Sequence, residues 1–260
     1  MENRLDIVIK EKYGYSREYA KDIILKGYVF VNGKAITKPS FKILHNDNLF
    51  LDEKATPKYV SRGGFKLEKA IQYFNLNIKD KICLDIGAST GGFTDCMLKH
   101  NASLVYAVDV GTKQLAEKIL NNERVISIEN MDIRNFESSQ KFDFISTDVS
   151  FVSLKKLIPK ITELMSDKGS CIFLIKPQFE AGRENIHKNG IVKNKNIHIQ
   201  VLNNVTNFCK ENKLFIKDIT YSPIKGSKGN IEYLAYATKQ QSNKSFAFKK
   251  IVFDAFNNLK

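Results

Sequence analysis

The sequence predicts an α/β fold, in which a Rossmann-like, doubly wound sheet has helices on both faces and is preceded by a small α+β domain. Three observations predict it. The run from Lys81 to Phe93 has the pattern of a buried strand, a glycine-rich turn and the start of a helix. Strand-length apolar segments then alternate with helical ones, and several of them end in a charged residue. The first 51 residues instead show two short helical patterns and an Asn-Gly turn.

A chain of 260 residues has room for a medium domain and a small one. Residues 52–60 are polar, contain Pro57 and have the composition of a linker. We therefore expect a small domain over residues 1–58 and a larger domain over residues 59–260.

The small domain is expected to begin with two helices, residues 4–12 and 17–26, with Ser16 as the N-cap of the second. Gly27 ends that helix, and a strand then leads into Asn32-Gly33, a strong hairpin signal. So few residues make a thin core.

The glycine-rich turn is typical of a nucleotide site. Residues 82–86 form the strand, and Gly87, Gly91 and Gly92 let backbone N–H groups approach a ligand at the start of the helix at residues 93–100. Ser89 stands where a dinucleotide-binding turn needs a glycine to admit a pyrophosphate. A cofactor with one nucleoside and no phosphate, such as S-adenosylmethionine, fits better; a purely structural turn is the alternative.

Later strands carry polar residues at their ends. Asp109 follows the strand at 104–108 and suits hydrogen bonds to ribose hydroxyls, and Asp132 follows the strand at 125–129 and could accept an adenine amino group. Strands alternating with helices imply a parallel sheet, whose carboxyl edge is the ligand edge. The expected cofactor-binding residues are Asp85, Gly87, Ala88, Ser89, Gly91, Gly92, Phe93, Asp109 and Asp132.

The remaining strands are expected at 142–148, 170–175, 215–221 and 230–237, with helices at 196–210 and 246–259. Residues 181–195 are polar and basic and have the character of a loop over the ligand edge, which makes them a candidate substrate contact.

Four ionisable residues stand out as candidate catalytic residues: Lys66, Asp148, Lys176 and Glu232. Three belong near the ligand edge by their positions at strand ends, and Lys66 lies in the first turn of a preceding helix. Two lysines and two carboxylates balance in charge. A lysine beside another lysine loses affinity for its proton, and carboxylates oppose this and hold the amine in place. Such a group suits the deprotonation of a hydroxyl, although any one of the four could belong to an ordinary salt-bridge network.

The charge distribution indicates a polyanionic partner. The net charge is +13, and residues 176–260 alone carry 15 basic and 6 acidic side chains. Nucleic acid near the C-terminal third is the obvious candidate, although a lysine-rich composition also keeps a protein soluble. The four cysteines and four histidines have no metal-ligand spacing, and no apolar run approaches a membrane span. We expect a cytoplasmic protein with no metal and no membrane partner.

The small domain resembles the S4-type RNA-binding domain, which ribosomal proteins share with pseudouridine synthases. The resemblance rests on Arg4-Leu-Asp, Ser16-Arg17, Ala20, Ile24, Gly27, Val29, Val31-Asn32-Gly33 and Lys38-Pro39. In that family the second helix offers a basic face to structured RNA. The resemblance therefore implies RNA contacts by Arg4, Arg17, Lys21 and Lys26, and Arg62 after the linker is added to this set.

The four charged residues resemble the Lys-Asp-Lys-Glu tetrad of FtsJ-type ribose 2'-O-methyltransferases, and nearly the whole chain resembles the TlyA family, also called haemolysin A. The matching segments are 59–70, 85–94, 107–111, 148–151, 175–180 and 226–232. The resemblance implies S-adenosylmethionine as methyl donor and cytidine 2'-O-methylation in ribosomal RNA of the small subunit, the large subunit or both. We expect Lys176 to be the general base, helped by Lys66, with Asp148 orienting its amine and Glu232 fixing Lys66 and the ribose.

Other classes of protein fit the sequence less well. A non-catalytic RNA-binding ribosome assembly factor would have no need of the whole tetrad. A cytolysin would need a secretion signal, a membrane span or a long amphipathic segment, and none is evident in the sequence. A base methyltransferase would want an Asn-Pro-Pro-Tyr-like segment where Asp148-Val-Ser-Phe stands.

Overall fold

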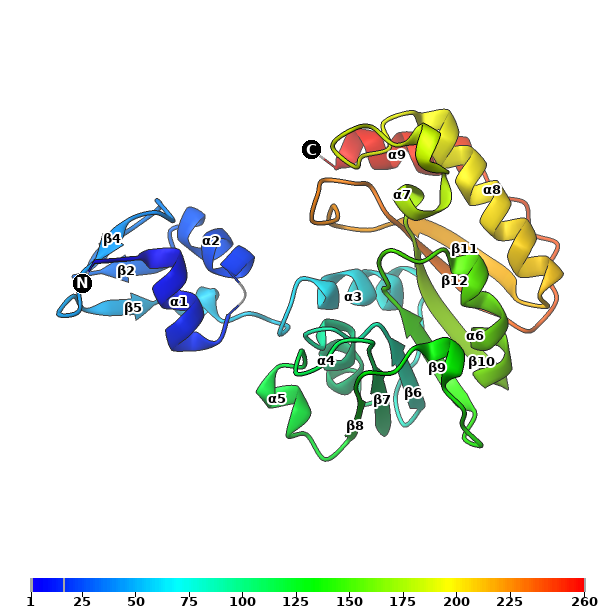
Figure 1. Ribbon diagram of the computed structural model, residues 1–260, viewed down its shortest axis with the longest axis horizontal. Coiled ribbons are helices and arrows are strands. Elements are labelled where there is room, and N and C mark those ends of the chain that lie inside the picture. Colours follow the sequence, from blue (N-terminus) through cyan, green and yellow to red (C-terminus); the bar gives the residue numbers. More distant parts are fainter. Residues whose placement is uncertain (1, 16, 260) are drawn as a thin grey trace. The chain divides into compact units, whose positions relative to one another are not determined.

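The structure of the protein, a computed structural model, describes residues 2–15 and 17–259 (Figure 1). The chain forms two compact units, Met1–Arg62 and Gly63–Lys260, which we call the small unit and the large unit. The expected domain boundary after residue 58 stays a prediction.

The small unit packs two short helices on short strands. Helix α1 (Leu5–Tyr13) lies against α2 (Arg17–Leu25). Three strands form an antiparallel sheet of order β3-β2-β5, and β1 pairs with β4. The bounds of the remaining elements are β1 (Asn3–Arg4), β2 (Val29–Val31), β3 (Lys34–Ala35), β4 (Lys42–Ile43), β5 (Leu49–Leu51) and the 3-10 helix η1 (Glu53–Ala55).

The predicted hairpin between β2 and β3 is confirmed, because Asn32 and Gly33 both take the left-handed conformation, at φ 51° and 79°. The expected N-cap, Ser16, lies outside the described residues. The apolar face of both helices is buried against the sheet, as helical spacing predicted. The core of the unit includes Leu5, Ile9, Ala20, Ile23, Ile24, Val29 and Val31.

The large unit is built on a seven-stranded sheet of order β11-β12-β10-β9-β6-β7-β8. The strands are β6 (Ile82–Ile86), β7 (Leu104–Val108), β8 (Val125–Ile128), β9 (Phe142–Thr147), β10 (Met165–Ile175), β11 (Phe215–Tyr221) and β12 (Tyr233–Thr238). The five strands from β6 to β10 are parallel. The chain winds from β6 out to β8 and then returns to β9 on the other side of β6. The carboxyl ends of β6 and β9 therefore flank the point where the strand order reverses, which is where ligands bind in sheets of this kind.

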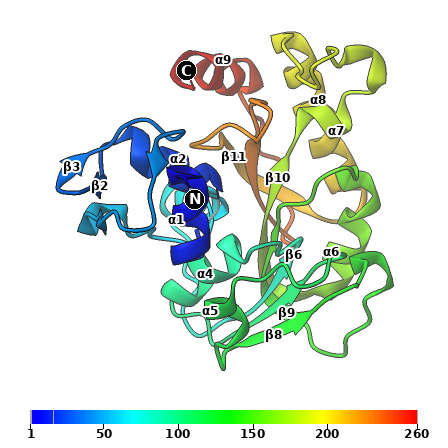
Figure 2. The ribbon, with the colours of Figure 1, turned by 60° about the vertical axis from the view of Figure 1, so that its left-hand side comes forward.

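Helices cover both faces of this sheet, as predicted (Figures 1 and 2). Alternate residues of β6 show the two faces: Leu84 and Ile86 belong to the core that includes α6, α8 and α9, whereas Asp85 faces α4. On the Asp85 side lie α3 (Gly63–Tyr73), α4 (Gly92–Lys99) and α5 (Glu117–Leu120); on the other side lie α6 (Ile158–Leu164), α8 (Lys195–Glu211) and α9 (Phe248–Asn258). The short helices are η2 (Ile133–Asn135), η3 (Leu154–Lys156), α7 (Pro177–Glu180) and η4 (Arg183–Asn185).

Two features differ from the expected parallel sheet. Strand β12 is antiparallel to both β10 and β11, because β11 connects to it through a turn and not through a crossover helix. Strand β10 begins at Met165, five residues before the expected start, and its register with β9 shifts between Met165 and Ser170. Neither change moves the carboxyl end of β10, where Lys176 follows.

Candidate active site

The glycine-rich turn after β6 has the tight backbone that its sequence predicted. Gly87 and Gly91 have φ of 79° and 87°, a conformation that favours glycine. A Cβ on Gly87 would lie 2.9 Å from the side chain of Val149 and 3.1 Å from the carbonyl oxygen of Asp148. Asp148 in turn donates its N–H to the carbonyl of Ile86 at 3.2 Å. The turn after β6 and the segment after β9 are therefore in direct contact.

Asp85 lies behind this turn rather than at its surface. Its carboxylate is 1% exposed and accepts hydrogen bonds from the hydroxyls of Thr94, at 2.7 Å, and Ser146, at 2.9 Å. Burial raises the pKa of Asp85 to about 6, although both hydroxyls oppose that shift. The residue joins β6, α4 and β9 beneath the turn, so its geometry is that of a support.

Asp109 reaches from the end of β7 to the same turn. Its carboxylate accepts the N–H of Ser89 at 2.8 Å and the N–H of Gly111 at 2.7 Å, and lone pairs remain free for a ligand. Ser89 and Val110 are exposed beside it. Asp132, after β8, accepts hydrogen bonds from the backbone and guanidinium of Arg134, which lower its pKa to about 2.

Ala88, Gly92 and Phe93, the other expected cofactor residues, are buried in the turn and the first turn of α4. All members of the expected cofactor-binding set thus lie in or next to the carboxyl edge of β6, β7 and β8.

The four candidate catalytic residues form one connected cluster. Lys66 Nζ on α3 lies 2.8 Å from Glu232 Oε2 and 3.0 Å from Asp148 Oδ2. Lys176 Nζ lies 2.7 Å from the other oxygen of Asp148. The charges therefore alternate in the order Glu232, Lys66, Asp148, Lys176, and residues up to 166 positions apart in the chain meet at the end of the sheet.

The cluster is buried, and its opposite charges offset the cost of that burial. Lys66, Lys176 and Glu232 are 8%, 6% and 3% exposed. Burial alone would lower the pKa of Lys66 and raise that of Asp148, but the neighbouring opposite charges outweigh it. The pKa of Lys66 is raised and that of Asp148 is lowered, so both carry their charges at neutral pH.

Three further residues hold the cluster in place and were not assigned a role from the sequence. Lys176 Nζ donates to Ser150 Oγ at 3.1 Å. Glu180 on α7 accepts from Ser153 Oγ and from the N–H of Leu154, both at 2.7 Å, which ties the segment after Asp148 to the helix after Lys176. Gly226 lies so close to Glu232 that a Cβ would be 2.5 Å from Oε1. For Gly226 the only sequence signal was a glycine within the basic stretch of residues 222–229.

The five basic residues expected to contact RNA fall into two groups. Arg4 and Arg17 converge on the fully buried carboxylate of Asp6, at 2.9 and 3.1 Å, and the Arg4 hydrogen bond is the main cause of the lowered pKa of Asp6. Their side chains remain 40% and 50% exposed. The second group is scattered: Lys26 pairs with Asp22, Arg62 contacts Glu18, and Lys21 is half-buried.

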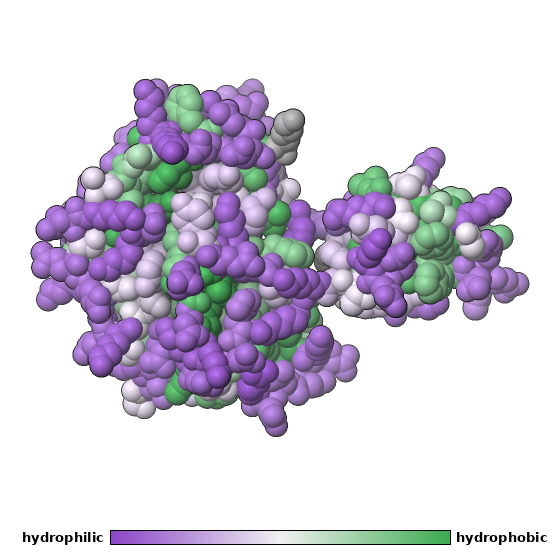
Figure 3. All heavy atoms as spheres, turned by 180° about the vertical axis from the view of Figure 1, so that it is seen from behind, coloured by the Kyte–Doolittle hydropathy of each residue, from purple (hydrophilic) through white to green (hydrophobic). Residues whose placement is uncertain are grey.

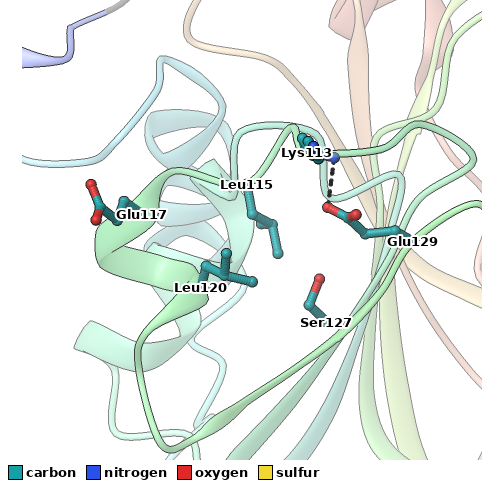
Figure 4. A pocket seen from close by; sticks show the side chains of 6 residues that line it. All are labelled: Lys113, Leu115, Glu117, Leu120, Ser127 and Glu129. Carbon is teal, nitrogen blue, oxygen red and sulfur yellow. Dashed lines mark hydrogen bonds between the residues drawn. The ribbon is translucent and has the colours of Figure 1, made fainter.

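A pocket of about 470 Å³ lies between α5 and β8 (Figure 4). None of the expected site residues lines it, but it borders the glycine turn, since a Cβ on Gly91 would lie 3.0 Å from its lining residue Leu115. In it the carboxylate of Glu129 accepts the N–H of Lys113 at 2.8 Å. The pocket is lined by Lys113, Leu115, Glu117, Leu120, Ser127 and Glu129.

Within residues 2–15 and 17–259, no three or more His, Cys, Asp or Glu side chains are grouped so that they could hold a metal ion. No helix in this described part of the chain has the length and apolar character needed to cross a membrane. Hydrophilic residues predominate on the face of both units seen in Figure 3.

Comparison with known families agrees with this organisation. The FtsJ-like methyltransferase model matches residues 59–239, and the S4 domain model matches residues 3–49. Hemolysin A of Brachyspira hyodysenteriae is 46% identical over 90% of this chain and 98% of its own length.

Two relatives have names that state a substrate. The 23S rRNA (cytidine-2'-O)-methyltransferase TlyA of Campylobacter jejuni is 36% identical over 91% of this chain and 99% of its own. The 16S/23S rRNA (cytidine-2'-O)-methyltransferase TlyA of Mycobacterium tuberculosis is 30% identical over 90% and 88%.

Solved structures show the same fold. A candidate hemolysin from Streptococcus thermophilus has a TM-score of 0.79 and 42% identity, covering 99% of this chain and 96% of its own. A candidate S-adenosylmethionine-dependent methyltransferase from Listeria monocytogenes, 16% identical with a TM-score of 0.52, covers 70% of this chain and 100% of its own and shares the fold alone. The chain belongs to the family of FtsJ-like methyltransferases that carry an S4 domain, together with the hemolysin A and TlyA proteins.

Proposed function

We propose that this protein transfers a methyl group from S-adenosylmethionine to the ribose 2'-oxygen of a cytidine in ribosomal RNA of the small subunit, the large subunit or both. The observation that carries the proposal is the contact between the glycine turn and the charged cluster, made by Gly87 against Asp148 and Val149. A donor on the turn and a hydroxyl at the cluster would thus be neighbours. The activities stated in the names of the two TlyA relatives support the choice of substrate.

The turn after β6 suits the donor. The positive φ values and close packing of Gly87 and Gly91 keep side chains out of the turn, and the carboxylate of Asp109 is held by two backbone N–H groups with lone pairs to spare for ribose hydroxyls. Asp132 would accept an adenine amino group at its carboxylate, which is 31% exposed although Arg134 donates to both of its oxygens. When bound, S-adenosylmethionine supplies an activated methyl group.

The cluster suits the activation of a hydroxyl. A ribose 2'-OH is a weak acid at neutral pH, so a positioned base helps. We assign that role to Lys176 as its neutral amine, which would accept the proton at Nζ; the positive charge of Lys66 in the same cluster would favour this deprotonated form. Asp148 and Ser150 orient its amine, and Lys66, held by Glu232 and Asp148, fixes the carboxylate of Asp148 from the other side. Glu232 would also help to position the ribose.

The small unit suits RNA. Arg4 and Arg17 are anchored through Asp6 and keep part of their guanidinium surface exposed, a preorganised arrangement for phosphate groups. Lys21, Lys26 and Arg62 would add contacts. The proposed substrate implies that the protein acts in the cytoplasm.

The test has two parts. Mapping of ribose methylation in ribosomal RNA from cells with and without the protein should identify a cytidine that loses its 2'-O-methyl group. Single-turnover methyl transfer on saturating RNA should then be slower by about 10²–10⁴ in Lys176→Ala, the usual contribution of a general base. Lys176→Arg should not restore the rate, because arginine keeps its proton at working pH.

Unchanged ribose methylation in cells without the protein would refute the proposed reaction. If Lys176→Arg ran at the parent rate, Lys176 would be a positioning group and another residue or water would be the base. Donor binding and RNA binding by both variants, measured separately, serve as controls for folding.

A further inference from the structure

Two polar segments, the loop at residues 186–193 and the turn at residues 222–230, are joined beside Glu232. The side chain of Asn230 joins them and is only 3% exposed. Its Oδ1 accepts the N–H of Val192 at 3.1 Å, and its Nδ2 donates to the carbonyl of Gly190 at 2.8 Å. The amide thus pairs with backbone groups of the loop as a neighbouring strand would. Its loss would leave the N–H of Val192 and the carbonyl of Gly190 without these partners.

The backbone of Asn230 belongs to the turn that packs on Glu232. Its carbonyl accepts the N–H of Gly226 at 2.9 Å, and the carbonyl of Gly226 accepts the N–H of Gly229 at 2.8 Å. The same Gly226 lies against the carboxylate of Glu232. The position of the loop is therefore coupled, through one residue, to the position of Glu232.

His198 holds the loop at a second point. It is fully buried, with ring nitrogens 2.9 Å from the carbonyl of Val192 and 2.8 Å from the hydroxyl of Tyr233. Burial lowers the pKa of His198, so the ring is neutral at neutral pH. A carbonyl only accepts, so Nε2–H must donate to Val192, and Nδ1 accepts from Tyr233, the residue after Glu232. Both backbone groups of Val192 are fixed.

The joined segments present positive charge without an acid. Residues 185–210 and 219–231 contain no Asp or Glu. Lys188, Lys193 and Lys228 are exposed and Lys225 is half-buried. Lys228 lies over the loop, since its side chain comes within 3.5 Å of the Cβ position of Gly190. We call Lys188, Lys193, Lys225 and Lys228 the clamped basic surface.

Both ends of the charged cluster connect to this surface. The loop follows Lys176 after the short helices α7 and η4, and Asn230 precedes Glu232 by two residues. We propose that the clamped basic surface binds the phosphate backbone of RNA beside the target nucleotide, and that Asn230 is the positioning residue that keeps these charges in register with Glu232. The inference rests on the proposed function for the identity of the RNA, but its binding step is measurable without methylation.

The experiment compares four full-length variants with the parent. The first replaces Lys188, Lys193 and Lys228 by alanine. The matched control replaces Lys79, Lys168 and Lys210, which are also exposed. Lys79 precedes β6, Lys168 precedes the buried part of β10, and Lys210 precedes β11, so all three lie at the opposite edge of the sheet. The third is Asn230→Ala, and the fourth combines Asn230→Ala with the first set. The readouts are affinity for a ribosomal RNA fragment as a function of salt, and the single-turnover rate at saturating RNA.

We expect the first variant to bind RNA about tenfold or more weakly and to lose about 2 from the log–log salt slope, since each phosphate contact to a single strand contributes roughly 0.7. Its saturated rate should stay within about threefold of the parent, because phosphate contacts chiefly affect binding. Asn230→Ala should weaken RNA binding to a similar extent, and the combined variant should be little worse than either, because both changes remove the same contacts. The control should match the parent.

RNA affinity at the parent level in the first variant would refute the surface. Fully additive losses in the combined variant would refute the positioning role of Asn230. If the parent binds RNA through this surface but methylates nothing, the proposed reaction fails and the inference about binding stands.

Discussion

The replacement Gly226→Ala tests whether the spacing between Glu232 and Lys66 matters for the reaction. Gly226 has no positive φ, so alanine is compatible with its backbone. The new Cβ would nevertheless lie 2.5 Å from Glu232 Oε1, whereas ordinary contacts begin near 3.4 Å. The carboxylate must therefore move away by about 1 Å. It is the end of a flexible side chain, so we expect the backbone to keep its conformation.

The expected magnitude follows from the ion pair that this retreat lengthens. Lys66 Nζ and Glu232 Oε2 are now 2.8 Å apart, and Lys66 would keep only its 3.0 Å contact with Asp148. A hydrogen bond between charged groups contributes roughly 1.5–3 kcal/mol. If the methyl-transfer step uses this geometry, losing most of the bond should slow it by about 10- to 100-fold, at about 1.4 kcal/mol for each factor of ten.

The assay is single-turnover methyl transfer at saturating RNA and donor, with Ser227→Ala as the control. Ser227 is the neighbouring residue, and it is exposed, so its replacement changes the turn without touching Glu232. Glu232→Gln gives the reference for loss of the charge. A Gly226→Ala protein that unfolds like the parent and also reacts at the parent rate would refute the argument that the Lys66–Glu232 distance controls catalysis.

Two further predictions concern Asp109 and Asp85. Asp109→Ala removes the acceptor for the N–H groups of Ser89 and Gly111, and it should weaken S-adenosylmethionine binding by about tenfold or more with an unchanged fold; calorimetry that finds the parent affinity would remove Asp109 from the site. Asp85 has a folded-state pKa of about 6 against an ordinary value of 3.8, so the folded protein keeps this proton more tightly and the contribution of Asp85 to stability falls by about 3 kcal/mol as pH rises from about 4 to 6. The stability of Asp85→Asn relative to the parent should therefore rise across that window and then level off, and urea unfolding that gives a pH-independent difference would contradict the cause given for the raised pKa.

The sequence by itself was enough to predict the local elements. The strand, the turn and α4 around Gly87 and Gly91 were predictable because only glycine readily takes the positive φ values that both residues have. The helices at the two ends of the chain followed from apolar spacing, and the polar residues after β7, β8, β9 and β10 lie at one edge because parallel strands end together. The antiparallel direction of β12 was missed, although the short turn expected between residues 221 and 230 leaves no room for the crossover that a parallel strand needs.

The partners of the site side chains were decided by tertiary structure. Lys66 pairs with Glu232, which is 166 positions away in the sequence. Sequence patterns over a few residues do not determine which carboxylate a lysine pairs with. The sequence equally could not tell that Asp85 is held by Thr94 and Ser146, although it predicted Asp85 to be a cofactor-binding residue.

The same holds for the supports of the site. Asn230 looked like any polar residue at the start of a strand, and Gly226 like any glycine in a turn. Asn230 matters because its buried amide pairs with two backbone groups 38 and 40 residues away. Gly226 matters because its missing Cβ leaves room for the carboxylate of Glu232. Periodicity and turn chemistry act over a few residues and so can be read along the chain, whereas burial and hydrogen-bond pairing depend on which segments the packed sheet brings together.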